Sequence, residues 1–383
     1  MPGLFSEFAL KDVRLRNRVA VSPMTQYSCG PDGVVTDWHL VHLGARAIGG
    51  AGLVVVEQAA VSPEGRMTNG CLGLWNDEQA EALARIARFI RSTGAVPGIQ
   101  LGHSGRKGSI SRPWEGYSQL PTDHPDAWEP IGPSPTPFGG RFPRGARAMT
   151  QADIDTVQAQ FAAAARRALN AGFDWVELHY AHGFLGASFF SPIANQRTDA
   201  YGGSPENRAR FLLETFDSVR AVWPERLPLT ARIGALDFHP DSHTLEDSID
   251  LVRALGDRGL DLIDISMGMN TEEATVPFAE RGFMLPAAGR IRRETGVPTA
   301  ASWNLADPAH ADQVIGEGLI DLLMIGRPML ANPHWPYYAA MLLGENAPLD
   351  LMPEQYRYFL AKAQGVPHAS GFAGAMQHNA PPR

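Results

Sequence analysis

Eight short apolar runs recur along the chain, and a polar turn follows each of them. The runs are rich in β-branched residues and too short for helices, which predicts buried β-strands at residues 18–22, 53–57, 96–100, 173–178, 227–233, 260–265, 297–301 and 321–325. Between them, apolar residues at spacings of three and four predict amphipathic helices at 78–91, 151–171, 205–223, 245–257, 285–294 and 306–317. Strands and helices therefore alternate along the sequence.

This alternation predicts one closed (β/α)₈ barrel, a TIM barrel, over residues 1–345. An open doubly wound sheet alternates in the same way, but eight units match the closed barrel, and no Gly-rich dinucleotide turn follows the first strand. Residues 107–149 and 267–284 each follow a strand without fitting the repeat, so we expect long loops over the catalytic face. We expect residues 346–367 to form a C-terminal extension and residues 368–383 a disordered tail.

Composition narrows the function. The 383 residues carry 33 Lys and Arg against 41 Asp and Glu, a formal charge of −8 without runs of like charge, which disfavours nucleic acid and anionic membranes as partners. No apolar stretch approaches the roughly 20 residues of a membrane span, and the first residues do not resemble a secretion signal. Two cysteines can make neither a disulfide framework nor a four-thiolate metal site. We expect a cytoplasmic protein that acts on a small molecule.

Polar residues occur at or just past the ends of the predicted strands, which meet at one mouth of a barrel: Thr25, Gln58, Gln100, His179, Arg232, Ser266, Trp303 and Arg327. Trp303 and Asn304 follow the seventh strand, and Gly326 and Arg327 follow the eighth. Many barrels bind phosphate at these two loops, and an Arg there can donate two parallel hydrogen bonds. The sequence predicts a phosphorylated ligand, with an ion pair of Arg327 to Asp321 or another carboxylate as the alternative.

His179 and His182 lie three residues apart, a spacing that brings both imidazoles to one side of a helical turn. Two neutral imidazoles could hold the oxygen of a carbonyl, enolate or nitro group. A metal site with Glu177, or two merely structural histidines, are the alternatives. Arg232 ends the fifth strand and needs an anion, either a ligand that becomes negative during the reaction or a structural partner such as Glu177 or Asp264.

Four motifs give the chain a specific resemblance: residues 195–208 (NQRTDAYGGSPENR), 16–24 (RNRVAVSPM), 98–107 (GIQLGHSGRK) and 325–327 (IGR). With these motifs the chain resembles the Old Yellow Enzymes from about residue 4 to about residue 359, in particular the bacterial branch that contains xenobiotic reductase A. The resemblance implies one FMN per subunit over the barrel mouth, NADPH or NADH as reductant, and a homodimer or larger oligomer.

The resemblance also implies the residues around FMN. Pro23, Met24, Thr25 and Gln58 would border the flavin ring near N5 and O4, Gln100 would bond its pyrimidine edge, and Arg232 would lie by N1 and the C2 carbonyl. The ribityl phosphate would be surrounded by Trp303, Asn304, Gly326 and Arg327. This assignment agrees with the phosphate site and the anionic partner that the strand ends suggest.

For catalysis, the resemblance implies that His179 and His182 bind the activating oxygen of an α,β-unsaturated carbonyl compound. Hydride would pass from the nicotinamide to flavin N5 and, after the nicotinamide departs, to the substrate β-carbon. Tyr27 and Trp303 would lie near the substrate, as would Phe359 of a neighbouring subunit, which would bring residues 346–367 to a subunit interface. The chain would thus be an NAD(P)H-dependent ene-reductase.

Three residues depart from this branch. Thr25 stands where a cysteine is usual, Gln58 where a small residue is usual, and Phe184 where a tyrosine protonates the substrate α-carbon. Phenylalanine cannot donate a proton. We expect the proton to come from solvent or Tyr27, or the acceptor to be one that does not need this tyrosine, such as a nitro compound, a nitrate ester or a quinone.

Other functions fit parts of the pattern. A desaturase, quinone reductase or demethylating dehydrogenase could use the same flavin barrel. A non-redox lyase or isomerase of a phosphorylated sugar would usually need a Lys or carboxylate base at a strand end, yet none of Lys11, Lys107 and Lys362 lies within a predicted strand. A binding protein without catalysis is a third alternative, which the histidine pair and Arg232 disfavour.

Overall fold

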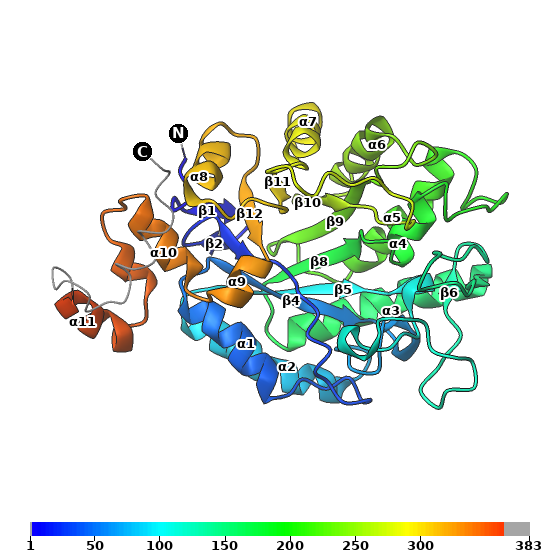
Figure 1. The fold of residues 1–383 in the computed structure, drawn as a ribbon, viewed down its shortest axis with the longest axis horizontal. Helices are drawn as coiled ribbons and strands as arrows, with labels where there is room; N and C mark the ends of the chain where they lie inside the picture. Colours follow the sequence, from blue (N-terminus) through cyan, green and yellow to red (C-terminus); the bar gives the residue numbers. More distant parts are fainter. Residues whose placement is uncertain (1, 364–383) are drawn as a thin grey trace.

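The computed structural model describes residues 2–363 and contains a closed barrel of eight parallel strands (Figure 1). The first barrel strand pairs with the last, which closes the sheet. The strands are β3 (Val19–Val21), β4 (Leu53–Ala60), β5 (Val96–Gly102), β8 (Trp175–Tyr180), β9 (Leu229–Leu236), β10 (Leu262–Met267), β11 (Thr299–Ala301) and β12 (Leu322–Ile325). All eight predicted strands and the predicted (β/α)₈ fold are confirmed.

The helices around the barrel include the six that apolar spacing predicts. They are α2 (Asp77–Ser92), α3 (Gln151–Asn170), α5 (Pro205–Arg220), α6 (Leu245–Gly256), α7 (Leu285–Thr295) and α8 (Pro308–Gly316). Side-chain caps fix where most of them begin, because Asn76, Thr150, Ser204, Thr244 and Asp307 each accept a backbone N–H of the first turn. Their apolar rows pack on the strands and form one large core.

Other elements did not follow from the sequence pattern. Helix α1 (Asp37–Ile48) connects β3 and β4, and its buried face carries His39, His42 and Arg46, which interrupt the apolar periodicity. The remaining elements are short: β1 (Phe8–Leu10), β2 (Val13–Leu15), β6 (Ile131–Gly132), β7 (Arg147–Ala148), α4 (Leu185–Phe190), α9 (Arg327–Ala331), α10 (Trp335–Leu342), α11 (Glu354–Ala363) and the 3₁₀ turns Pro63–Gly65, Gly105–Lys107, Pro113–Glu115 and Pro348–Leu351.

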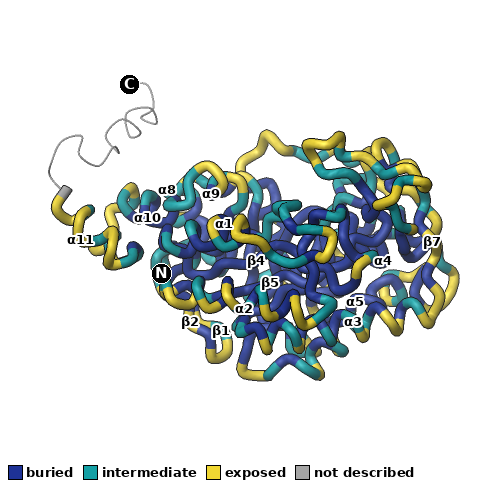
Figure 2. Tube along the Cα trace, turned by 90° about the horizontal axis from the view of Figure 1, so that it is seen from below, coloured by how far each residue is buried: buried dark blue, intermediate teal, exposed yellow. Residues whose placement is uncertain are grey.

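Two long loops, 103–150 and 268–284, follow β5 and β10. They confirm the prediction that the two segments outside the strand–helix repeat form long loops. At the other end of the chain, α11 lies away from the barrel body, and most of its residues are exposed (Figure 2). The predicted disordered tail, 368–383, lies outside the described residues. Within residues 2–363, no helix has the length and apolar character to cross a membrane.

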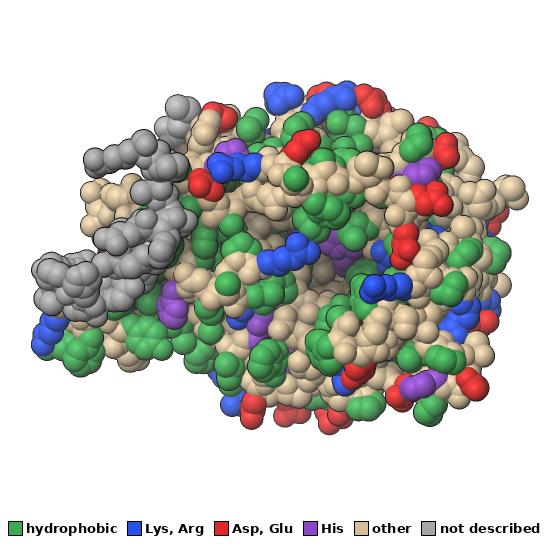
Figure 3. All heavy atoms as spheres, in the orientation of Figure 1, with side chains coloured by type: hydrophobic (Ala, Val, Ile, Leu, Met, Phe, Trp, Pro, Cys, Tyr) green, Lys and Arg blue, Asp and Glu red, His purple; other side chains and the backbone are tan. Residues whose placement is uncertain are grey.

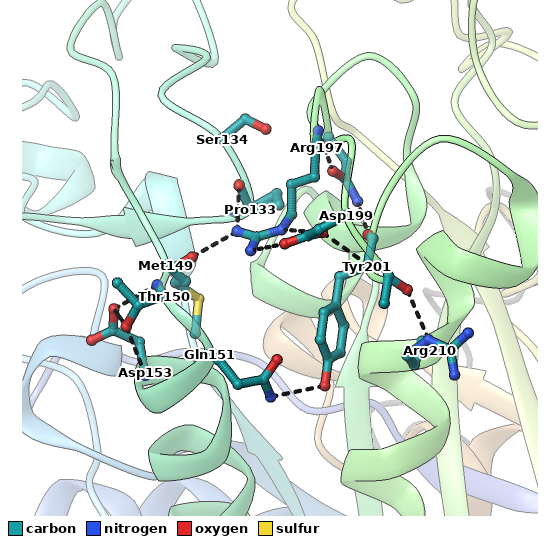
Figure 4. A network of polar contacts seen from close by, with 12 residues as sticks. Pro133, Ser134, Met149, Thr150, Gln151, Asp153, Arg197, Asp199, Tyr201 and Arg210 are labelled. Carbon is teal, nitrogen blue, oxygen red and sulfur yellow. Dashed lines mark hydrogen bonds and ion pairs between the residues drawn. The ribbon is translucent and has the colours of Figure 1, made fainter.

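The 195–208 motif joins the first of these loops to the helices (Figure 4). The Arg197 guanidinium forms two hydrogen bonds with Asp199, of 3.0 and 2.5 Å, and also donates to the carbonyls of Pro133 and Met149. Gln151 at the start of α3 donates to the hydroxyl of Tyr201. The most specific motif of the sequence therefore has an architectural role, in which it anchors the loop 103–150.

Candidate active site

A cavity of about 450 Å³ lies at the C-terminal mouth of the barrel. Figure 3 shows a hollow near the centre of one face with histidine surface in it. Its walls come from the ends of β3, β11 and β12, from Arg232 within β9 and from the turn after β8. Nine of the predicted site residues line it: Pro23, Met24, Thr25, His182, Arg232, Trp303, Asn304, Gly326 and Arg327. The strand-end argument thus brings most of the proposed residues to one cavity.

Gln58 and Gln100 do not line this cavity but are register partners on β4 and β5. Gln100 Nε2 donates to Glu177 Oε1 at 2.7 Å, and both side chains are buried. The Gln58 side chain packs closely against Gly102. A Cβ atom added to Gly102 would lie 2.7 Å from the Gln58 amide, so only glycine fits there without a shift of that side chain. Its buried Oε1 has no hydrogen-bond partner within residues 2–363. A buried acceptor of this kind costs free energy unless a donor reaches it.

His179 and His182 do meet, although not on a helical turn as their spacing suggested. His179 belongs to β8, and His182 follows with a positive φ of 58°, which turns its ring back toward the strand. His182 Nδ1 lies 3.3 Å from His179 Nε2, and the ring centroids are 4.9 Å apart at 75°. Phe184 packs edge-on against His179 at 4.9 Å. Within residues 2–363, no three His, Cys, Asp or Glu side chains gather as metal ligands would.

Burial controls the protonation of this pair. It lowers the pKa of His179 and of His182 well below the usual histidine value, and the cations Arg232 and Lys107 lower both further. Both imidazoles are therefore neutral near pH 7, and each carries one N–H donor. Two such donors at one point can hold a single acceptor oxygen.

Ser266 at the end of β10 connects this pair to the opposite wall of the cavity. The Ser266 hydroxyl lies 2.7 Å from His182 Nε2, and Trp303 Nε1 donates to the same hydroxyl at 3.0 Å. Trp303 has a positive φ of 77°. The sequence placed Ser266 at the barrel mouth without giving it a role, because this contact depends on how two loops fold back.

Arg232 has structural partners and also faces the cavity. Its Nε lies 3.0 Å from Asp264 Oδ2, and its Nη2 donates to Ser302 Oγ at 2.9 Å. Burial raises the pKa of Asp264 to about 6, and burial together with Asp264 raises that of Glu177 to about 8. The ion pair expected as an alternative is present, yet Arg232 also lines the cavity. The two interpretations of this arginine are therefore not exclusive.

The end of the cavity where the sequence predicts a phosphate site, called the phosphate end below, is open to solvent. Arg327 is exposed, with its guanidinium 5.8 Å from the centre of the Trp303 ring. The alternative that Arg327 pairs with Asp321 is wrong, because Asp321 forms hydrogen bonds of 2.7 and 2.9 Å with Arg292. Asn304 lines the cavity, but its Nδ2 donates to two carbonyls of the loop 268–284. Gly326 and Arg327 are thus the better placed of the predicted phosphate ligands.

Tyr27 and Phe359 lie away from the lining of this cavity. Tyr27 has a positive φ of 54°, packs edge-on against Trp114 at 5.9 Å, and borders the apolar cluster that contains Phe184. Phe359 on α11 is 69% exposed and does not line the cavity of its own chain. Its predicted place in the site of a neighbouring subunit stays a prediction.

Two supporting residues were missed by the sequence analysis. Lys107 Nζ donates to the backbone carbonyls of His182 and Met269 at 2.7 and 2.9 Å, and burial lowers its pKa to about 7. Glu57 sits at a β-bulge in β4 and accepts the backbone N–H of Gln26, which holds the loop after β3. Both residues occur in stretches that the sequence singled out, but their partners are distant along the chain.

Comparison with known proteins agrees with this architecture. The family model described as "NADH:flavin oxidoreductase / NADH oxidase family" matches residues 3–345. An NADPH dehydrogenase of Geobacillus thermodenitrificans (strain NG80-2) is 42% identical over 345 residues, which are 89% of this chain and 94% of that protein.

Two solved structures extend the comparison. Morphinone reductase in complex with tetrahydroNAD has a TM-score of 0.73 at 28% identity and covers 92% of this chain and 95% of its own. A 2-naphthoyl-CoA reductase complex has a TM-score of 0.81 at 27% identity over 91% of this chain, which spans about half (53%) of that protein. The chain therefore belongs to the NADH:flavin oxidoreductase / NADH oxidase family, as its resemblance to the Old Yellow Enzymes predicted, and is an FMN-dependent NAD(P)H oxidoreductase.

Proposed function

We propose that the protein reduces the activated C=C bond of α,β-unsaturated carbonyl compounds with NAD(P)H. The observation that carries the proposal is the neutral histidine pair, whose facing nitrogens lie 3.3 Å apart beside the cavity. The N–H groups of the two rings would hold the carbonyl oxygen of the substrate, which gains negative charge during reduction. Membership of a flavin oxidoreductase family supports the part of this proposal that concerns hydride transfer from NAD(P)H.

The residues present fit FMN. The cavity has an exposed cation at one end, Arg327, and a buried cation toward the other, Arg232. Polar atoms without partners within residues 2–363, Ser22 Oγ in the cavity wall and Gln58 Oε1 near it, match the polar edge of a flavin ring. When bound, FMN would supply hydride-transfer chemistry between NAD(P)H and the substrate. Pro23, Met24 and Thr25 would border its ring, and Gly326 and Arg327 would hold its phosphate.

The histidines would orient the substrate and stabilise the charge that develops on its oxygen. Because both imidazoles are neutral, each donates one N–H and neither loses its proton to the enolate. Removing one such preorganised donor costs about 10²–10³-fold in rate in other enzymes. Lys107 holds the backbone carbonyl of His182 and so supports the turn that aims this ring.

The proton that the substrate α-carbon gains after hydride transfer has no donor at position 184, because phenylalanine carries none. Tyr27 borders the same cluster as Phe184, although burial raises the pKa of its phenol well above the usual value. We therefore propose solvent or Tyr27 as donor for enones. The same observation favours nitro compounds, nitrate esters and quinones as second candidates, since their reduction does not require that tyrosine.

The absorbance of the FMN-loaded protein under anaerobic conditions tests both candidates. NADPH is added first and 2-cyclohexenone second, while the flavin band is followed. We expect bleaching and then recovery as the enone is reduced. Bleaching without recovery by the enone, but with recovery by a quinone or nitro compound, would replace the first candidate with the second. Absence of bleaching by NADPH or NADH would overturn both.

We also propose that α11 carries residues 346–363 into a subunit interface, which is supported by the exposed aromatic side chains Tyr356, Tyr358 and Phe359. Light scattering should give the mass of a dimer or larger oligomer for the 41.5 kDa chain. A monomer at micromolar concentration would contradict this proposal. A cytoplasmic location stays a prediction.

A further inference from the structure

We propose that Ser266 and Trp303 are positioning residues that fix the proton of His182 on Nδ1. A neutral imidazole has two tautomers, and only the one protonated at Nδ1 aims a donor at the point where His179 and His182 meet. The use of that donor rests on the proposed function. The position of the proton is a separate property of the protein and can be measured without turnover.

The three side chains form a short chain of hydrogen bonds. Trp303 Nε1 lies 3.0 Å from Ser266 Oγ, and Ser266 Oγ lies 2.7 Å from His182 Nε2. On the far side of the ring, His182 Nδ1 lies 3.3 Å from His179 Nε2. Ser266 is fully buried at the end of β10, so water does not compete for its hydroxyl.

Counting hydrogens fixes the direction of these bonds. An indole nitrogen can only donate, so Ser266 Oγ accepts from Trp303. Within residues 2–363, His182 Nε2 is the one other hydrogen-bond partner of this hydroxyl. The hydroxyl hydrogen therefore goes to His182 Nε2, which must be the unprotonated nitrogen. The ring proton then lies on Nδ1.

The opposite arrangement leaves a group unsatisfied. If His182 carried its proton on Nε2, Ser266 would accept from both His182 and Trp303, and its own buried hydrogen would have no acceptor. A buried donor without a partner is costly. A doubly protonated ring meets the same obstacle at Nε2, and it would also lie beside the cations Arg232 and Lys107.

The backbone holds the two ends of this chain in place. His182 and Trp303 both have positive φ values, 58° and 77°, in a region that residues with a side chain rarely adopt. The Trp303 ring also packs against Phe278 and Phe283, with both ring centroids at 5.9 Å. These contacts fix the direction of the indole N–H toward Ser266.

Nuclear magnetic resonance of ¹⁵N-histidine-labelled, FMN-loaded protein tests the proposal directly, because two-bond ¹H–¹⁵N correlations distinguish the tautomers. Loss of one set of signals in His182→Gln identifies His182. We expect the Nδ1–H tautomer alone in the parent protein, and appearance of the Nε2–H tautomer in Ser266→Ala. Ser266→Thr keeps a hydroxyl and should keep the Nδ1–H tautomer. An Nε2–H tautomer in the parent, or an unchanged tautomer in Ser266→Ala, would overturn the proposal.

Two further variants separate positioning from general disturbance. Ser248→Ala removes another buried serine hydroxyl, which donates to the Ala235 carbonyl at 2.9 Å, and should leave the His182 tautomer unchanged. Trp303→Phe keeps the Ser266 hydroxyl but removes its donor, so a minor Nε2–H population should appear. Its absence would remove Trp303 from the proposal.

Kinetics provide the second readout. In Ser266→Ala we expect reoxidation of the reduced enzyme by 2-cyclohexenone to slow about tenfold, the loss typical of one buried hydrogen bond. Reoxidation by ferricyanide, which accepts single electrons without a developing enolate oxygen, should keep its rate. Equal slowing with both oxidants would overturn the assigned role. If the enone is not a substrate at all, the proposed function fails, while the tautomer measurement still decides this inference.

Discussion

The two ends of the cavity differ in how far the protein alone completes them. At the histidine end, His179 and Ser266 are buried, and the Ser266 hydroxyl lies 2.7 Å from His182 Nε2. At the phosphate end, Arg327 is exposed and its guanidinium contacts the Trp303 ring. The end that would act on the substrate is thus preorganised by its own side chains, whereas the anchoring end keeps its charge in solvent until a phosphate arrives. On the proposed function, this division would separate catalysis from cofactor retention.

The largest effect is expected from breaking the histidine end. His182→Ala should lower the rate at which 2-cyclohexenone reoxidises the reduced enzyme by about 10²–10³-fold, because one preorganised donor to the substrate oxygen is lost. Stopped-flow absorbance of the flavin band measures this rate. The FMN dissociation constant should change far less than the rate. A loss of activity that merely follows loss of FMN would contradict the division between the two ends.

A substitution at the phosphate end should instead weaken the binding of FMN. Arg327→Ala should weaken FMN binding about 10–100-fold, as expected for a charge-assisted contact to phosphate. Fluorescence titration of apoprotein with FMN measures the dissociation constant. Arg290→Ala is the matched control, because Arg290 is a surface arginine whose partners are Glu246 and Glu294. Equal dissociation constants in the Arg327 and Arg290 variants would show that the phosphate binds elsewhere.

A smaller effect should sharpen the account of the histidine end. Phe184→Tyr restores a proton donor next to His179, where the ring packs at 4.9 Å. We expect enone turnover to rise about tenfold, less than the roughly 10²–10⁴-fold typical of a general acid, because solvent or Tyr27 already supplies the proton in the parent, and we expect nitro reduction to stay the same. Steady-state rates with both substrates test this. If neither rate changes, protonation at position 184 does not limit the reaction.

The smallest expected effect concerns the buried carboxylates near Arg232. Burial and Asp264 raise the pKa of Glu177 to about 8, so the folded protein binds more protons than the unfolded chain from about pH 4.5 to pH 8. Glu177 therefore makes the free energy of unfolding fall as pH rises through this window. Glu177→Gln should remove that fall, so the free energy of unfolding of the variant should gain on that of the parent as the pH rises from 5 to 9. Denaturant titration of the apoprotein measures the free energy of unfolding at each pH. Parallel pH profiles for the parent and the variant would contradict this prediction.

Much of the fold was predictable because its elements repeat two simple periods. The eight strands are short runs rich in apolar residues and the six helices carry apolar residues at helical spacing, and the helix limits agree because caps such as Thr150 and Thr244 lie at their starts. Helix α1 could not be found in this way, since His39, His42 and Arg46 occupy its buried face. His39 is buried beside Glu57, whose Oε1 lies 3.4 Å from His39 Nε2.

The site was predictable as a set of strand ends but not as a set of contacts. The rule that strand ends meet at one mouth brought Arg232, Trp303 and Arg327 to the cavity. It could not reveal the left-handed turn at His182 or the link from Ser266 to Trp303, because these depend on how separate loops fold back. The helical turn expected for the histidines was wrong for the same reason.

A crystal structure of the FMN-loaded protein tests the division of the cavity most directly. We expect the phosphate against Gly326 and Arg327, the flavin ring between Arg232 and the segment 23–25, and the facing nitrogens of His179 and His182 free for a substrate oxygen above the ring. Phosphate density at the histidine end, or a flavin ring that covers both histidines, would contradict the account.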